Sequence, residues 1–214
     1  MNGPGNDVTP TVFDDGHSLF FASARPGSLG HGDIYVSHRV HTRDDFAWQP
    51  PIHLGVSINS AANEIGPSFV TRTRTLYFSV DAPAAPGEIM ASELQPDGTF
   101  SVPLPVHEVN SSSDELRPTV RRDGLEMYFD SNRPGGLGGT DIWVATRDSV
   151  HDPWRTPVNA GPAINSAASE ARAALSFDRL GLIFQSTRPG GSGGVDLYSS
   201  TRRLYAPRRS ATAP

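Results

Sequence analysis

Three segments of the chain combine an arginine, several glycines and an aspartate, residues that could bind a phosphate, hold a metal ion or only shape a tight loop. They read SARPGSLGHGDIY at 23 to 35, SNRPGGLGGTDIW at 131 to 143 and STRPGGSGGVDLY at 186 to 198. A phosphate-binding glycine loop needs one copy, placed between a strand and the first turn of a long helix, whose free N–H groups face the phosphate. Three copies indicate a repeated building block.

The spacing of these segments gives the length of the block. Arg25 and Arg133 are 108 residues apart, which is twice 54, and Arg133 and Arg188 are 55 apart. Each repeat also opens on an acid, at steps of 57, 51 and 55, namely Asp7, Glu64, Glu115 and Glu170. A fixed period of this length is typical of propellers and solenoids.

Four units follow from this period, and together they predict one domain over residues 1–201. The predicted boundaries are 7–63, 64–114, 115–169 and 170–201, with a C-terminal tail at 202–214.

Each unit reads as a series of short strands. The acid-led strand and a turn are followed by SLFFAS, TLYFSV, EMYFDS or LIFQS, whose continuous apolarity predicts that both faces are covered. A third strand begins at DIY or its equivalent, and a proline-bearing segment, such as WQPPIHLG, comes last. Proline is confined to sheet edges, so this segment is predicted to be outermost. No stretch shows helical periodicity.

These observations predict an all-β fold, a β-propeller of four-stranded antiparallel blades with the acid-led strands innermost. Unit four has no clear outer strand, so about fifteen strands are expected. The edge left unpaired in this way could support self-association.

The composition of the chain excludes several classes of chemistry and of binding partner. The chain has no cysteine, and all 18 of its basic residues are arginine, which excludes thiolate chemistry and the lysine of a phosphate-binding loop. A net charge of −5 shows no excess of positive charge of the kind that binds nucleic acid or anionic lipid. No apolar run approaches the length of a membrane span. We therefore expect no nucleic-acid partner, no membrane insertion and no cofactor.

The recurring pattern of an acid, a proline soon after, a DG turn, a YF-x-S strand, RPGG and then DIY resembles the TolB-type, WD-repeat-like propeller repeat of bacterial proteins. The resemblance covers about residues 6–201. Unit two departs from it at SVDAPAAPGEIM, which has lost the arginine and most glycines, and unit four departs at FDRLG. The resemblance implies binding of a protein or peptide partner and a periplasmic or secreted location. The first residues, MNGPGND, do not read as a signal peptide, which leaves a cytoplasmic location open.

The glycine-rich loops have two interpretations. In the structural one, glycines supply positive φ, the arginines pair with acids between blades, and an aspartate in each loop accepts hydrogen bonds from loop N–H groups. The structural repeat positions are then Asp33, Asp141 and Asp196, together with Glu64, Glu115 and Glu170. In the functional one, the arginines ring the top face and hold an anionic group, which makes Arg25, Arg133 and Arg188 candidate ligand-binding residues.

Metal binding is not expected. An isolated glycine-aspartate loop cannot supply the oxygens that calcium requires. One position of the outer strand carries His53, His107 or Asn159 in three of the units. Outer strands of neighbouring blades lie too far apart for these residues to share a metal, so we expect them at a solvated edge.

Two classes of function remain. The first is a non-catalytic scaffold, with no catalytic residues, that binds a protein, peptide or small ligand on its top face or axial opening. The alternative is a carbohydrate-active hydrolase or lyase that uses acids of the degenerate second unit, where Asp81, Glu88, Glu108 and Asp114 are the candidates. A cavity beside that unit with two acids of perturbed pKa would favour the enzyme.

Overall fold

The structure, a computed structural model, describes residues 2–13 and 15–202. Within these ranges the chain forms fifteen strands in four antiparallel sheets and contains no helix. Accordingly, the described residues include no helix that could cross a membrane. The sheets are the blades of a four-bladed β-propeller, which confirms the predicted fold class.

Each blade consists of consecutive strands paired in chain order. Blade 1 contains β1 (Asp7–Val12), β2 (Ser18–Ser23), β3 (Asp33–His38) and β4 (Ile52–His53). Blade 2 contains β5 (Asn63–Val70), β6 (Thr75–Asp81), β7 (Glu88–Glu93) and β8 (Leu104–Pro105). Blade 3 contains β9 (Glu115–Val120), β10 (Glu126–Ser131), β11 (Asp141–Thr146) and β12 (Val158–Asn159). Blade 4 contains β13 (Glu170–Leu175), β14 (Gly181–Ser186) and β15 (Asp196–Thr201).

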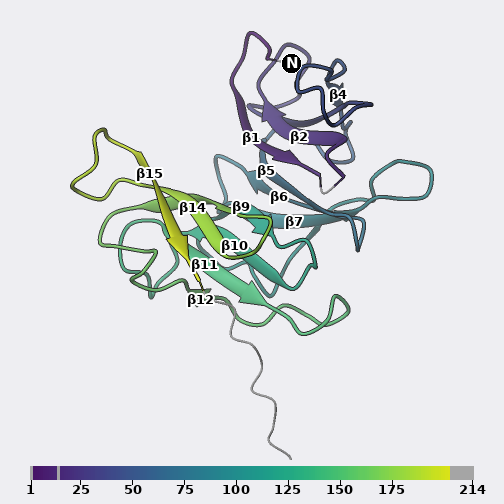
Figure 1. The fold of residues 1–214 in the computed structure, drawn as a ribbon. Coiled ribbons are helices and arrows are strands. Elements are labelled where there is room, and N and C mark those ends of the chain that lie inside the picture. Colours follow the sequence, from purple (N-terminus) through teal and green to yellow (C-terminus); the bar gives the residue numbers. More distant parts are fainter. Residues whose placement is uncertain (1, 14, 203–214) are drawn as a thin grey trace, which may run out of the picture.

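The blades follow one another from the purple blade 1 to the yellow-green blade 4 (Figure 1). The acid-led strands β1, β5, β9 and β13 all line the propeller axis, as predicted. The proline-bearing outer strands β4, β8 and β12 are only two residues long. Proline has no N–H to donate to a ladder, which explains why pairing there is so short.

Each pair of neighbouring blades buries one apolar cluster between its sheets. The clusters centre on Phe20 and Phe78 between blades 1 and 2, on Phe129 and Trp143 between blades 2 and 3, and on Phe184 between blades 3 and 4. The second strand of a central blade contributes to the clusters on both of its sides, which explains its continuous apolarity.

Glycine in the RPGG loops serves a close approach between blades. A Cβ at Gly138 would lie 1.8 Å from the carbonyl oxygen of Ala168, and one at Gly30 would lie 1.8 Å from that of Ala62. The loops of blades 1 and 3 therefore pack against the connection into the next blade. The φ of Gly138 is not positive, so our prediction of positive φ gives the wrong reason there, although Gly135 does have a φ of 94°.

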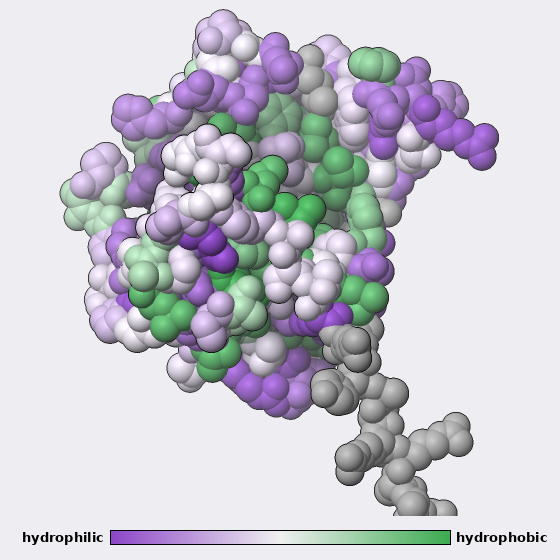
Figure 2. Space-filling view, turned by 60° about the vertical axis from the view of Figure 1, so that its left-hand side comes forward, coloured by the Kyte–Doolittle hydropathy of each residue, from purple (hydrophilic) through white to green (hydrophobic). Residues whose placement is uncertain are grey.

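The far face of blade 4 is the exception to this packing. Ile183 is 52% exposed and Leu197 78% exposed, although their equivalents in blade 3 lie against blade 4. Our prediction of coverage on both faces is thus wrong for β14, because no described segment follows to cover it. Figure 2 turns this side forward and shows apolar residues gathered over it. The predicted self-association through the unpaired edge stays a prediction, and the predicted tail beyond Arg202 lies outside the described residues.

Because these glycines allow close contact between blades, alanine substitution should destabilise the protein more at a contacted glycine than at the equivalent uncontacted glycine of blade 4. We expect Gly138→Ala to lower the free energy of unfolding by about 2 to 3 kcal/mol, because the methyl group would overlap the Ala168 carbonyl. At Gly193, the equivalent residue of blade 4, the nearest atom to a new Cβ is 3.9 Å away, so Gly193→Ala is the matched control. Urea unfolding measures both. Equal losses in the two variants would contradict the inter-blade role.

Candidate functional site

In blades 1, 3 and 4, the acid at the start of the inner strand is held by the arginine of the same blade. Arg133 Nη2 lies 2.7 Å from Glu115 Oε1, and Arg188 Nη2 lies 3.2 Å from Glu170 Oε1. Arg25 Nη2 lies 2.7 Å from Asp7 Oδ1. Each guanidinium also lies over the aromatic rings of its own blade. The three predicted ligand-binding arginines are thus engaged within the chain and lie in three separate blades; their binding of an anion stays a prediction.

The aspartates that end the glycine-rich loops fold those loops back. Asp33 accepts hydrogen bonds from the N–H groups of Leu29 and Gly30, and Asp141 accepts them from Leu137 and Gly138. Asp196 accepts one from Gly193 at 3.2 Å. A carboxylate that satisfies several N–H groups fixes a loop that has few side chains of its own.

Sequence reasoning missed an asparagine and a serine that join each blade to the next. Asn59 Oδ1 accepts the N–H of Ile34 at 2.7 Å, while its Nδ2 donates to the carbonyl of the same residue at 3.0 Å. Ser60 then donates from its backbone N–H and its hydroxyl to Glu64. The same contacts recur at the Asn-Ser pairs 110–111 and 165–166. The repeated Asn-Ser four residues before the buried acid was the available signal.

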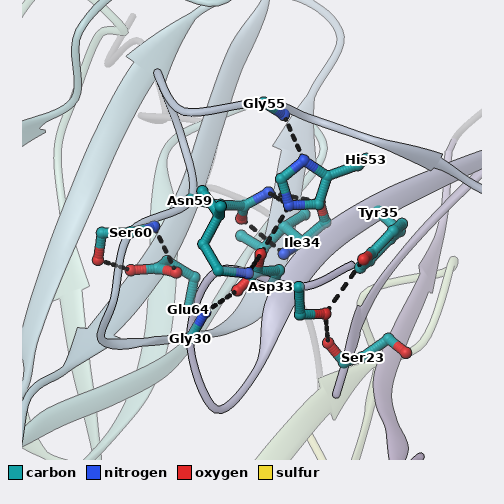
Figure 3. A network of polar contacts seen from close by, with 12 residues as sticks. Ser23, Gly30, Asp33, Ile34, Tyr35, His53, Gly55, Asn59, Ser60 and Glu64 are labelled. Carbon is teal, nitrogen blue, oxygen red and sulfur yellow. Dashed lines mark hydrogen bonds and ion pairs between the residues drawn. The ribbon is translucent and has the colours of Figure 1, made fainter. Parts of the chain in front are cut away.

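His53 belongs to this network in blade 1 (Figure 3). Its Nε2 lies 2.6 Å from Asp33 Oδ2, and its Nδ1 accepts the N–H of Gly55 at 3.1 Å. In blade 3, Asn159 makes the equivalent contacts with Asp141 and Gly161. Both side chains are half-buried, so the predicted solvated edge is wrong for these two positions. Asn159 makes the same hydrogen bonds in blade 3 that His53 makes in blade 1, which indicates that His53 has a structural role.

The loss of the arginine in blade 2 has an electrostatic consequence. Val80 and Ala82 occupy the positions that hold a serine and an arginine in the other blades. Burial raises the pKa of the Glu64 carboxyl, with only Ser60 among side chains opposing it. In blade 4 burial is outweighed, because hydrogen bonds from Ser186 and Ser166 and the charge of Arg188 lower the pKa of Glu170. The arginine thus offsets the cost of burying the carboxylate.

A channel runs along the axis between the four inner strands. Three adjoining cavities of about 270, 130 and 260 Å³ line up within it, and neighbouring cavities share residues. The first opens beside the glycine-rich loops, where His31 and Asn63 line it. The last opens at the opposite end, between Phe69 and Phe177.

Two arginines face the channel at its loop end. Arg117 Nη1 lies 3.0 Å from Asp130 Oδ2, and the backbone N–H of Arg172 donates to Asp130 Oδ1 at 2.8 Å. Arg117 and Arg172 both line the first and second cavities. Asp130 lies behind them and is 1% exposed, and this burial raises its pKa to about 6.

The backbone beneath these arginines is strained. Four equivalent residues of the inner strands have positive φ, at a bulge in each first hairpin: Thr9 (50°), Gly66 (64°), Arg117 (52°) and Arg172 (57°). A side chain in this region costs about 1 to 2 kcal/mol per residue. A proline follows the bulge residue in three of the blades. In three of the blades this strain is carried by a residue with a side chain, at one level of the axis, and local backbone strain of this kind is typical of functional sites.

The acids proposed for catalysis do not converge. Asp114 accepts hydrogen bonds from the Gly87 N–H and the Asn132 amide, and Glu88 and Glu108 are exposed at the surface. Asp81 is half-buried at the end of β6. A cavity of about 980 Å³ lies beside blades 2 and 3 and is lined by one acid, Glu93, together with the basic residues Arg72, Arg147 and His151. None of the four candidate acids lines this cavity or the channel. In the described residues no three His, Asp or Glu side chains are grouped to hold a metal ion.

The chain is similar in structure to propellers of two functional classes. It superposes on TolB from Acinetobacter baumannii with a TM-score of 0.63 and 16% identity, over 94% of this chain and 42% of that one. The endo-arabinase from Bacteroides thetaiotaomicron gives a TM-score of 0.62 and 18% identity, over 95% and 77%. The α-L-arabinofuranosidase from Podospora anserina gives 0.57 and 13%, over 92% and 73%.

The likeness is one of fold. The chain spans about two fifths of the length of the TolB protein that it matches. No protein-family model and no curated protein sequence matches it. These findings confirm the TolB-like propeller fold expected from the repeat, and they leave function to be argued from the residues at the site.

Introducing an arginine into blade 2 tests whether this side chain offsets the cost of burying the carboxylate. We expect Ala82→Arg to raise the free energy of unfolding by about 1 kcal/mol and to lower the pKa of Glu64, because the new guanidinium would reach the buried carboxylate. Ala85→Arg adds the same charge at an exposed site of the same loop and is the control. Urea unfolding and NMR titration of the Glu64 side chain measure the effects. An equal gain in both variants would indicate general charge compensation instead.

Asp130 predicts a pH dependence of stability. Its pKa is raised by burial to about 6 in the folded protein, above the ordinary value of 3.8. The folded state therefore binds a proton that the unfolded state does not, and stability rises as pH falls through 6. Relative to Asp130→Asn, which keeps the acceptor oxygen, we expect the wild type to gain about 1 kcal/mol between pH 7 and pH 5. Parallel pH profiles of the two proteins in urea unfolding would refute this.

Proposed function

We propose that the protein is a non-catalytic propeller module that binds its ligand at the loop end of the axial channel. The observation that carries this proposal is the pair Arg117 and Arg172, which faces an open cavity of about 270 Å³ on strained backbone. A cavity with a few convergent polar groups is the usual form of a small-molecule site, and here those groups come from two adjacent blades.

The arrangement of acids supports binding over catalysis. Hydrolysis of a glycosidic bond uses two carboxyl groups that flank the bond, about 5 to 10 Å apart. The axial cavities are lined by no acid, and the large outer cavity by Glu93 alone. The fold itself is common to TolB and to the arabinan-degrading enzymes, so the proposal rests on these side chains. The TolB-type repeat also favours a periplasmic or secreted location, which fractionation of the source cells tests.

The proposed site predicts where small molecules bind. We expect a fragment library added to ¹⁵N-labelled protein to shift the amide signals of the axial residues Thr9, Ile65 and Arg117 most. The signals of Thr73 and Val102, in the outer cavity, are the internal comparison. Shifts confined to the outer cavity would contradict the axial site.

The absence of catalysis is tested separately. We expect no release of reducing sugar from arabinan or xyloglucan, since no pair of acids meets in a cavity. Release that disappears in Glu93→Gln would establish the outer cavity as an active site and overturn the non-catalytic proposal.

A further inference from the structure

The wall of the axial channel carries only one sign of charge. Five arginines and a histidine line its three cavities, and no aspartate or glutamate does: Arg117, Arg172, Arg121, Arg122, Arg179 and His31. The whole chain has a net charge of −5, so this concentration runs against the overall balance. A channel lined by one sign of charge raises the local concentration of the opposite ion.

Neutralisation differs between the two ends of the channel. At the far end, Arg121 pairs with Asp123 and Glu126, and Arg179 pairs with Asp123. At the loop end, the guanidinium of Arg117 pairs with Asp130, whereas Arg172 reaches that carboxylate with its backbone N–H alone. Among the described residues, the guanidinium of Arg172 therefore lies at the loop end without a carboxylate partner.

Donor groups at the loop end are left without acceptors. Nε of Arg117 is buried and has no hydrogen-bond partner among the described residues. The guanidinium of Arg172 makes no hydrogen bond or ion pair within the described part of the chain, and burial and the nearby charge of Arg117 lower its pKa. Buried donors without acceptors and adjacent like charges both cost stability, and an anion between the two groups would offset both costs.

The backbone fixes where these donors point. The N–H of Arg117 donates to Ser79 Oγ at 2.6 Å, and that of Arg172 donates to Asp130 Oδ1 at 2.8 Å. Each bond joins the bulge of one blade to the second strand of the blade before it. On the neighbouring inner strand, a Cβ at Gly66 would lie 2.5 Å from Cα of Arg117, so the backbone of blade 2 packs directly against the base of this arginine. The arginines therefore start from rigid positions, which lowers the entropic cost of binding.

We propose that the axial opening binds the oxyanion group of a ligand, a carboxylate or a phosphate, between Arg117 and Arg172. This inference rests on the proposed function, because it names the ligand chemistry of the same site. Guanidinium groups present planar pairs of N–H donors that match the oxygens of carboxylate and phosphate, which makes arginine the residue suited to such recognition.

The test measures binding of sodium phosphate and sodium succinate by calorimetry, at an ionic strength held constant with sodium chloride. We expect the wild type to bind at least one of the two anions. Arg155→Gln alters an exposed surface ion pair and is the control, so its affinity for that anion should equal that of the wild type. Arg172→Gln should weaken that binding at least tenfold, and Arg172→Lys should lie between. The anion that binds more tightly identifies the source of the oxyanion as a phosphorylated or a carboxylate-bearing ligand.

A second variant tests the charge balance in the opposite direction. Asp130→Asn removes the negative charge beside Arg117 and keeps the oxygen that accepts the Arg172 N–H, so anion binding should tighten severalfold. Three results would overturn the proposal. They are no anion binding by the wild type, the same anion affinity in Arg172→Gln as in the wild type, and the same loss of affinity in Arg155→Gln as in Arg172→Gln. If fragments still shift the axial amides while the anions do not bind, the oxyanion chemistry alone fails. If neither binds at the axis, the proposed function fails with it.

Discussion

A buried carboxylate at the start of the inner strand in blades 2, 3 and 4 is the constraint on which the rest of this structure depends. Glu64, Glu115 and Glu170 are fully buried, and an ionised carboxylate in that position is costly unless several donors surround it. Its partners come from two blades: the backbone and hydroxyl of a serine in the preceding connection, and a serine and an arginine of its own blade. The glycine-rich loop brings that arginine back over the sheet. The carboxylate thus joins neighbouring blades as well as the strands of one blade.

The same constraint explains why blade 2 differs without losing the fold. Glu64 keeps its serine donors from the preceding connection but has no arginine, and its loop is shorter. The backbone contact between blades is nevertheless retained, since Glu64, Glu115 and Glu170 each donate an N–H to the end of the loop in the preceding blade. The apolar cluster around Phe78 and the stacked rings of Phe13 and Phe69 add packing at this interface. Degeneration of one loop therefore changes the electrostatics of the acid more than the position of the blade.

The fourfold repeat also determines which residues line the axial channel. A bulge with positive φ places one residue of every inner strand at the same level of the channel, and that residue is threonine, glycine or arginine. The repeat thus supplies a common backbone while the side chains break the symmetry. Arginines from two adjacent blades lie beside one aspartate at the loop end, where only Arg117 forms an ion pair with it, whereas Arg121 and Arg179 at the opposite end are both ion-paired.

The sequence by itself determined the period, the class of fold, the order of strands and the innermost place of the acid-led strands. These properties are local, because hydrophobic pattern, turn residues and proline act within a few residues of the chain. The side-chain partners of Arg133, the link through Asn59 and the meeting of Arg117 with Arg172 and Asp130 were decided by tertiary structure. Arg117 and Arg172 are 55 residues apart and occupy ordinary-looking places in two strands. Only the packing of neighbouring blades around a common axis sets them at one level, where burial and like charge give them a chemistry that neither has in its own strand.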